Sequence, residues 1–305
     1  MKPNFQKIIE EISREVLPLL GLGKVANYIP ELAKIDPRKI GISICDIDGN
    51  VYSTGDCKTL FSIQSISKLF TLCLAMKLED NELWNRVGME PSGTAFNSLV
   101  LLEEENGIPR NPFINAGAIV ITDIILGKSK HPSDSILKFM REITQNKNIK
   151  FNDTVAVSER KHGHRNAALS YLMKDYGNIH KEVEEVLNLY CRHCSLELNC
   201  EDLARASYFL INQGKDIDGK TVLIPRDVKR VNSLMMTSGL YNNAGKFAFE
   251  VGLPAKSGVG GGIVGVLPGQ FSISVWSPEL NESGNSLIGM KVMEMFTTKS
   301  GMSVF

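Results

Sequence analysis

The stretch Ser65-Ile66-Ser67-Lys68 begins a run, extending to Glu79, whose apolar residues recur at helical spacing with no Gly or Pro to interrupt them. A serine and a lysine three residues apart on a helix lie on the same face, so the Lys68 amine can reach the Ser65 hydroxyl. A lysine desolvated between a helix and a sheet can have its pKa lowered enough to act as the base that a serine nucleophile requires. Ser65 would also stand in the first turn of its helix, where free backbone N–H groups favour developing negative charge. The stretch predicts a nucleophile and its base, but Ser-x-x-Lys is a common pattern and needs a second element.

The second element is Lys256-Ser257-Gly258, on a strand that we predict over residues 255–259. Glycines follow it, and they let a backbone approach a substrate closely. A Ser-x-x-Lys helix early in a chain and a Lys-Ser/Thr-Gly strand late in it resemble the signature of the penicillin-recognising serine hydrolases. In that architecture the oxyanion hole uses the backbone N–H of the nucleophile and one from the late strand, here that of Val259. The pair of motifs predicts an α+β protein of the β-lactamase-like fold.

The hydrophobic pattern along the chain predicts an antiparallel sheet flanked by helices. Residues 5–20 have the spacing of an amphipathic helix, and residues 40–54 are typical of two strands joined at Asp48-Gly49. Further strands are expected at residues 247–251, 255–259, 262–267 and 271–276. Helical patterns dominate the middle of the chain, for example at residues 133–144, 166–176, 180–190 and 201–213. We expect a single domain of residues 1–305, in which a mainly helical lobe (about 76–225) is inserted into an α/β lobe (about 1–75 and 226–305).

Composition and charge exclude several classes of function. The 305 residues are 43% hydrophobic and 22% charged, which is typical of a globular protein with an ample core. The 34 basic and 34 acidic residues cancel, so no net field would draw the chain to nucleic acid or to a membrane, and a small-molecule substrate is expected. We find no export signal in the first residues and no apolar stretch long enough to span a bilayer. The six cysteines are therefore expected to be thiols in a reducing compartment, and the protein to be cytoplasmic.

Two further motifs imitate class A β-lactamases but are better explained by helix structure. Ser133-Asp134-Ser135 lacks the expected Asn, and it follows a proline at the start of a helical run, where such residues serve as caps. Glu184 belongs to an amphipathic helix with an apolar stripe on its other side. A secreted β-lactamase would also carry a signal peptide.

Three other patterns match cofactor or metal sites only by letter. Residues 260–265 match G-x-G-x-x-G, but a strand rather than a helix follows. Cys191-Arg-His-Cys194 has no second pair at zinc-ribbon spacing, so we interpret it as structural. His162 and His164 lie close to Glu159 without further ligands. We predict neither a metal nor a cofactor.

Ordered blocks along nearly the whole chain resemble the serine-dependent glutaminase family, a branch of the β-lactamase-like fold. The blocks are Gly23-Lys-Val-Ala-Asn-Tyr28-Ile-Pro30, Ser53-Thr-Gly-Asp56, Phe61-Ser-Ile-Gln64-Ser65-Ile-Ser-Lys68, Glu90-Pro-Ser-Gly-Thr94, Asn111-Pro-Phe-Ile-Asn115-Ala-Gly-Ala, Ser158-Glu159, Arg165-Asn166, Tyr190 before Cys194-Ser195, Thr237-Ser-Gly-Leu-Tyr241 and Pro254-Ala-Lys256-Ser-Gly-Val259. So many blocks in one order are not expected by chance. They change the expected substrate from a β-lactam to L-glutamine.

The resemblance implies a set of site residues. Ser65 would be the nucleophile and Lys68 its base, with Tyr28, Tyr241 and Lys256 as further catalytic residues. The residues that would line the glutamine pocket are Ser65, Asn115, Glu159, Asn166, Tyr190, Tyr241 and Val259. Glu159 is the natural partner of the substrate ammonium. A tyrosine would pass a proton to the leaving ammonia, and the sequence does not rank Tyr28, Tyr190 and Tyr241 for this role.

We therefore predict a glutaminase that hydrolyses L-glutamine to L-glutamate and ammonia through an acyl-enzyme on Ser65, for glutamine catabolism and glutamate supply. The family forms homo-oligomers, often tetramers, and a homotetramer is implied. Two alternatives remain. One is a β-lactam or peptide serine hydrolase with the same two motifs. The other is a non-catalytic glutamine-binding protein, against which intact Ser65, Lys68 and Lys256 argue.

Overall fold

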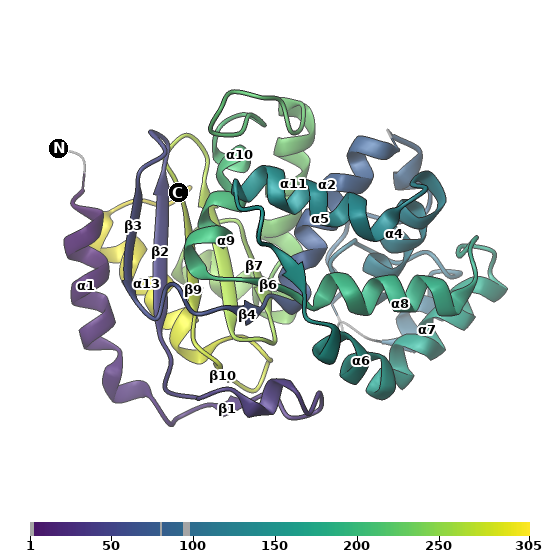
Figure 1. Ribbon diagram of the computed structural model, residues 1–305, viewed down its shortest axis with the longest axis horizontal. Helices are drawn as coiled ribbons and strands as arrows, with labels where there is room; N and C mark the ends of the chain where they lie inside the picture. The colour runs from purple at the N-terminus through teal and green to yellow at the C-terminus, as the bar shows by residue number, and fades with distance from the viewer. Residues whose placement is uncertain (1–2, 80, 94–97) are drawn as a thin grey trace.

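A five-stranded antiparallel sheet lies in one lobe of the computed structural model, which describes residues 3–79, 81–93 and 98–305 (Figure 1). The strands are β2 (Gly41–Asp46), β3 (Val51–Gly55), β7 (Ala255–Gly258), β8 (Gly262–Leu267) and β9 (Phe271–Trp276). Their order is β3-β2-β9-β8-β7, so the early hairpin joins the late strands through the pairing of β2 with β9. The predicted class, an antiparallel sheet flanked by helices, is confirmed. Thr94, the end of one block in the sequence, lies outside the described residues.

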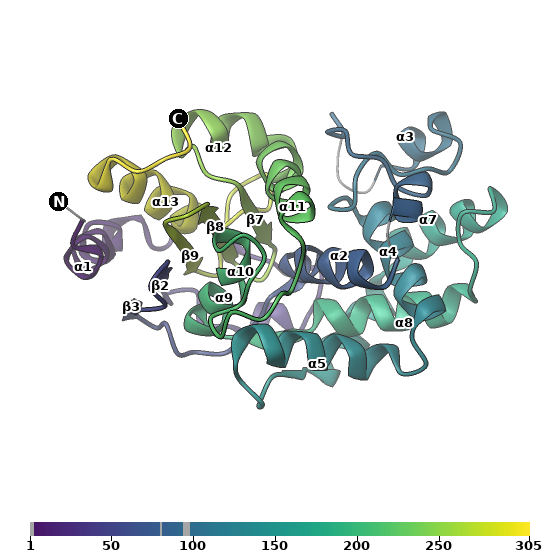
Figure 2. The same ribbon diagram turned by 90° about the horizontal axis from the view of Figure 1, so that it is seen from above.

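Helices cover both faces of this sheet because successive residues of a strand point to opposite sides. On one face α1 (Phe5–Glu15) and α13 (Leu287–Ser300) share a core with Ile42 and Ile44 of β2 (Figure 2). On the other face α9 (Cys200–Ala206) packs against β2 and β9. There Ser274 Oγ donates a hydrogen bond of 2.6 Å to the carbonyl of Cys200, which satisfies a buried hydroxyl.

The second lobe is built around two helices that pack against each other, α2 (Ser67–Leu78) and α4 (Asn115–Lys128). Nearly all their residues are buried, so neither helix shows an amphipathic stripe. The helices around them are α3 (Leu99–Glu104), α5 (Pro132–Thr144), α6 (Asp153–His162), α7 (His164–Asp175), α8 (Val183–Cys194) and α11 (Pro225–Ser238), whereas α10 (Tyr208–Ile211) packs beside α9 against β8 and β9. Two small sheets complete the fold, one of β1 (Lys24–Val25) and β10 (Glu279–Leu280), the other of β4 (Phe61–Ser62), β6 (Leu196–Leu198) and β5 (Lys150–Phe151).

Apart from the turn at Ser65, three predicted elements differ in the structure. The strand predicted at residues 247–251 was wrong, because these residues lie in and just after a helix, α12 (Ala244–Glu250). The alternation of Phe247, Phe249 and Val251 favoured a strand, but Phe249 is 92% exposed while Phe247 and Val251, one helical turn apart, are buried. The first helix ends at Glu15 rather than near residue 20, since Pro18 cannot continue its hydrogen bonds. The helix predicted over residues 201–213 is divided into α9 and α10.

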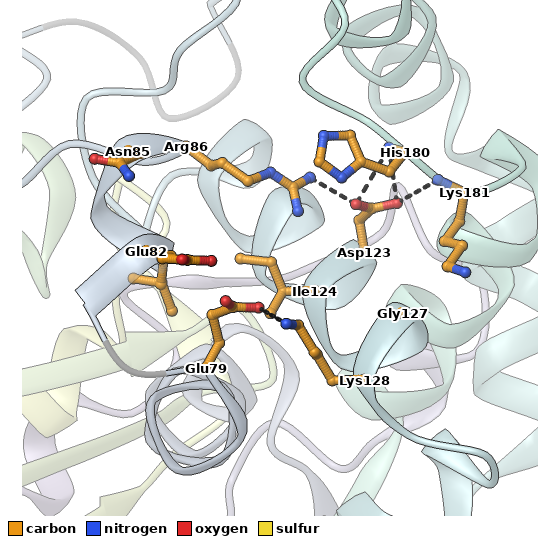
Figure 3. A pocket seen from close by; sticks show the side chains of 11 residues that line it. Glu79, Glu82, Asn85, Arg86, Asp123, Ile124, Gly127, Lys128, His180 and Lys181 are labelled. Carbon is orange, nitrogen blue, oxygen red and sulfur yellow. Dashed lines mark hydrogen bonds and ion pairs between the residues drawn. The ribbon is translucent and has the colours of Figure 1, made fainter.

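A cavity of about 460 Å³ in the helical lobe is lined by charged residues of both signs (Figure 3). Asp123 of α4, only 1% exposed, lies 2.6 Å from Arg86 Nη2. Its carboxylate also accepts hydrogen bonds from the backbone N–H groups of His180 and Lys181. Asp123 thus ties α4 to Arg86 and to the segment that leads into α8, and its charge is fully engaged within the protein.

We expect Asp123→Ala to lower the free energy of unfolding by about 3–5 kcal/mol, because it leaves a largely buried guanidinium without its anionic partner and two backbone N–H groups without their acceptor. Urea denaturation measures the change. The control is Lys128→Ala, which removes the 2.7 Å ion pair with Glu79 in the same cavity but at a half-exposed side chain, and should cost far less. Equal losses in the two variants would contradict the assignment.

Candidate functional site

Ser65 lies in a short 3-10 turn, η3 (Gln64–Ile66), between β4 and α2. It was predicted in the first turn of a continuous helix, but α2 begins only at Ser67. The backbone departs from the helix at Gln64, whose φ of 49° is in the left-handed region that residues other than glycine rarely adopt. Gln64 is 2% exposed and donates from Nε2 to Ser62 Oγ at 2.9 Å. Backbone strain of this kind clusters at functional sites, where surrounding contacts maintain it.

A cavity of about 270 Å³ opens beside Ser65, near the small end of the range of about 300–1,000 Å³ that is usual for ligand sites. Eight of the predicted site residues line it, namely Tyr28, Ser65, Asn115, Glu159, Asn166, Tyr190, Tyr241 and Val259. The other two, Lys68 and Lys256, are 1% and 0% exposed and contact this set from behind. Five lining residues were not predicted, namely Ile29, Gln64, His162, Gly163 and Arg165. A signal for Gln64 is present in the sequence, since it directly precedes the predicted nucleophile, Ser65, in its block.

Lys68 is held by two oxygen atoms in the protein interior. Its Nζ donates to Asn115 Oδ1 at 2.5 Å and to the carbonyl of Phe113 at 3.4 Å. Asn115 in turn donates from Nδ2 to Asn166 Oδ1 at 2.9 Å, which orients its carbonyl oxygen towards the lysine. Burial lowers the pKa of Lys68 to about 8, because the interior solvates the ammonium poorly. A lysine with this pKa is partly neutral near physiological pH and can accept a proton.

Tyr241 is the tyrosine that contacts the predicted nucleophile. Its hydroxyl is hydrogen-bonded to the Ser65 side chain, and Lys256 Nζ donates to the same hydroxyl at 3.3 Å. The φ of Tyr241 is 54°, a second left-handed residue at the site. Burial raises the pKa of Tyr241 and lowers that of Lys256, which the nearby Lys68 charge lowers further. Tyr241 is therefore a neutral phenol next to Ser65 and can relay a proton.

Glu159 of α6 is 8% exposed, and its Oε2 has no hydrogen-bond partner among the described residues. Burial raises the pKa of Glu159 to about 7, while the Lys68 charge and hydrogen bonds from the Gln64 and Cys194 side chains oppose the rise. A desolvated carboxylate oxygen without a partner is unfavourable unless a donor or a cation meets it. The cavity thus offers a place for a cationic group of a ligand.

The other two tyrosines that line the cavity differ in exposure. Tyr28 is 57% exposed and lies at its edge, whereas Tyr190 of α8 is 2% exposed. Lys68 Nζ is 5.9 Å from the centre of the Tyr190 ring. Desolvation raises the pKa of the Tyr190 hydroxyl and also that of the Tyr28 hydroxyl, which is the end of an otherwise exposed side chain. Both hydroxyls are therefore neutral and can donate hydrogen bonds to a bound molecule.

The strand that carries Lys256 runs against the turn that carries Ser65. A Cβ atom at Gly260 would lie 2.2 Å from the carbonyl oxygen of Ser62, so only glycine permits this approach. Gly261 has a φ of 90° and turns the chain from β7 into β8. The glycines thereby bring the backbone at Val259 to the cavity. The G-x-G-x-x-G pattern leads into a strand, as predicted.

The remaining sequence motifs lie elsewhere. Ser133 is on α5 and Glu184 forms a surface ion pair with Arg160; neither lines the cavity. All six cysteines are buried free thiols. Within residues 3–79, 81–93 and 98–305, no group of three or more His, Cys, Asp or Glu side chains is placed to hold a metal ion. None of the helices in this part of the chain combines the length and the apolarity that crossing a membrane requires.

Known proteins are similar to this chain in fold and in sequence. The family model described as Glutaminase matches residues 23–305. The glutaminase of Ralstonia nicotianae is 52% identical over 303 residues, which cover 99% of this chain and 100% of that protein. The glutaminase of Shewanella amazonensis is 50% identical over 301 residues, which cover 98% of this chain and 99% of that protein. Among solved structures, the probable glutaminase ybaS has a TM-score of 0.93 at 35% identity, covering 98% of this chain and 97% of that one. A probable glutaminase from Bacillus subtilis complexed with 6-diazo-5-oxo-L-norleucine has a TM-score of 0.90 at 32% identity, and the match covers 100% of this chain and 98% of that one.

We expect Lys68→Met to raise the pKa of Glu159 above its value of about 7, because the lysine charge stabilises the carboxylate. A ¹³C NMR titration of glutamate-labelled protein measures the shift, with Glu159→Gln to identify the resonance. Lys229→Met on the exposed surface of α11 is the matched control and should leave the titration unchanged. An unchanged or lowered pKa in Lys68→Met would show that the two groups do not interact across the cavity.

Proposed function

Because the chain belongs to the glutaminase family, with the β-lactamase-like fold, we propose that it hydrolyses the side-chain amide of L-glutamine to L-glutamate and ammonia. The observation that supports this proposal best is the cavity itself. It places Ser65, hydrogen-bonded to Tyr241, in the same small space as the unpartnered oxygen of Glu159. Free glutamine carries an ammonium, a carboxylate and the amide to be cleaved, and the cavity has a group suited to each.

The substrate is bound by charge and by neutral donors. Glu159 Oε2 receives the α-ammonium, which stabilises the carboxylate that burial alone disfavours. The amide groups of Asn115 and Asn166 and the hydroxyls of Tyr28 and Tyr190 are the donors for the substrate carboxylate and the amide. The small volume favours a single amino acid over a peptide or a β-lactam.

Ser65 Oγ attacks the side-chain carbonyl carbon while its proton passes to the neutral amine of Lys68. Tyr241, in contact with both Ser65 and Lys256, transfers its proton to the departing nitrogen and is reprotonated by the proton that Lys68 took from Ser65, so the C–N bond breaks and ammonia leaves. The backbone N–H groups of Ser65 and Val259 stabilise the oxyanion. Water then attacks the γ-glutamyl ester while Lys68 takes its proton, and this proton passes to Ser65 Oγ as the C–O bond breaks, which releases glutamate and free Ser65.

We further propose a cytoplasmic location and a homotetrameric state. Six buried thiols with no disulfide among the described residues suit a reducing compartment. The tetramer rests on the family resemblance, and light scattering after gel filtration measures it. The reaction serves glutamine catabolism and glutamate supply.

Two experiments separate this proposal from its alternatives. Cleavage of a chromogenic cephalosporin without glutamine turnover would favour a β-lactam hydrolase, in view of the shared Ser65-x-x-Lys68 and Lys256-Ser-Gly motifs. Saturable glutamine binding in calorimetry without any glutamate release would favour a binding protein.

We expect Ser65→Ala to lower kcat for glutamate release by about 10³-fold or more, since no other group supplies the nucleophile. The diazo ketone 6-diazo-5-oxo-L-norleucine, a glutamine analogue, should label the wild-type peptide that contains Ser65 and leave Ser65→Ala unlabelled in mass spectrometry. Ser233→Ala, which removes a surface hydroxyl from α11, is the matched control and should keep full activity. Undiminished turnover by Ser65→Ala would refute the covalent mechanism.

We expect kcat/KM to fall on acidification in two steps, through the Lys68 pKa of about 8 and then the Glu159 pKa of about 7, because the base must be neutral and the ammonium partner charged. Glu159→Gln should abolish the lower step and raise KM about 30-fold or more, the equivalent of the 2 kcal/mol or more lost when one member of a buried charge pair is removed. The upper step should persist in that variant. A Glu159→Gln profile identical to that of the wild type would assign the lower step to another group.

A further inference from the structure

His193, the histidine inside Cys191-Arg-His-Cys194, joins the three helices that supply Lys68, Asn115 and Tyr190. It lies on α8 and is fully buried. Its Nδ1 is 2.8 Å from Ser67 Oγ at the start of α2, and its Nε2 is 3.1 Å from Thr122 Oγ1 on α4. In this Cys-x-x-Cys segment it is the histidine between the cysteines that links the helices.

The hydrogen bonds of Thr122 determine which ring nitrogen carries the proton. Thr122 Oγ1 donates its one hydrogen to the carbonyl of Ala118 at 2.7 Å, so towards His193 it can only accept. Nε2 must therefore be protonated. A neutral imidazole then has an unprotonated Nδ1, and the Ser67 hydroxyl must donate to it.

His193 remains neutral because both ring nitrogens meet hydroxyl groups, and no acidic side chain among the described residues is hydrogen-bonded to the ring. Burial lowers the pKa of His193 to about 3, and the Lys68 charge contributes to the lowering. One tautomer, with one direction of every hydrogen bond from Ser67 through His193 to Thr122 and Ala118, is thus fixed.

We propose that His193, as the neutral Nε2-H tautomer, is a positioning residue that fixes the start of α2, and with it Ser65 and Lys68, relative to α4 and α8. This inference rests on the proposed glutaminase function. Ser67 stands between the nucleophile and its base in the chain, so its bond to Nδ1 restrains both. At the other end, α4 begins with Asn115, which binds Lys68 Nζ.

The Tyr190 side of the cavity is fixed by the same residue. The Tyr190 and His193 rings pack edge to face, with their centres 5.1 Å apart and their planes at 77°. One imidazole therefore contacts both Tyr190, which lines the cavity, and the start of α2, which carries Lys68. Misplacement of reacting groups by about 1 Å can cost about 10²-fold in rate, so loss of this link should affect turnover more than binding.

The tautomer is tested by NMR on the wild-type protein, independently of activity. In a long-range ¹H–¹⁵N spectrum, protonated and unprotonated ring nitrogens have well separated shifts, and His193→Asn identifies the signal among the five histidines. The expected result is a protonated Nε2 and an unprotonated Nδ1 from pH 5 to 8. A protonated Nδ1, or titration in this range, would overturn the assignment.

The positioning role is tested by kinetics of four variants. His193→Leu should lower kcat about 10- to 100-fold and change KM less than about threefold. His193→Asn places an amide oxygen near the Nδ1 position, keeps the acceptor for Ser67, and should recover most of the loss. The longer side chain of His193→Gln reaches only towards Thr122, so this variant should not recover the lost kcat. Ser67→Ala, a milder change, should lower kcat by itself and add little to His193→Leu.

Ser274→Ala is the matched control, since it removes a buried serine hydroxyl from β9, on the sheet rather than on α2. It should lose stability in urea denaturation with unchanged kcat. If Ser67→Ala or His193→Leu behaves like this control, with stability lowered and kcat intact, the positioning role is refuted. If the wild type itself releases no glutamate, the proposed function fails instead.

Discussion

The burial of one ammonium group, Lys68 Nζ, determines much of the site. An uncompensated cation in the interior is unfavourable. Asn115 and the Phe113 carbonyl stabilise this ammonium by accepting hydrogen bonds, and the more distant charge of Glu159 also stabilises it. The same desolvation brings the lysine and the glutamate into the pH range where each can change protonation state. Because these two charges stabilise each other, a shift of either helix that carries them changes the protonation of the other group.

Two left-handed residues lie in the same small region, Gln64 beside Ser65 and Tyr241 in contact with it. Strain of this kind costs of order 1–3 kcal/mol per residue and persists only where the surroundings determine the conformation. Gln64 is anchored by Ser62 and Glu159, and Tyr241 by Ser65 and Lys256. The strained backbone turns both side chains into the cavity, which a regular helix would not do. The site is thus stabilised by its own hydrogen bonds as much as by the core around it.

The sequence predicted the parts of this fold that depend on local pattern. The strands at residues 262–267 and 271–276 have the predicted bounds, since their alternation and turns are local signals. The same alternation gave a false strand at 247–251, where burial of Phe247 and Val251 on one helical face prevails. For the site, the motifs gave the residue types. They could not show that Tyr241, rather than Tyr28 or Tyr190, meets Ser65, or that φ is positive at Gln64, because both depend on contacts between distant segments.

The order of strands in the five-stranded sheet affects how the chain folds during synthesis. The hairpin of β2 and β3 is made early, but its neighbour β9 and the strand with Lys256 lie in the last sixth of the sequence. Until that last portion emerges, one edge of β2 has no partner strand, and the apolar face of β2 that packs against α13 is exposed to solvent. Synthesis therefore leaves a long nascent chain with an incomplete sheet and no assembled pair of Ser65 and Tyr241. A truncated product would be inactive, and it would also be prone to aggregate.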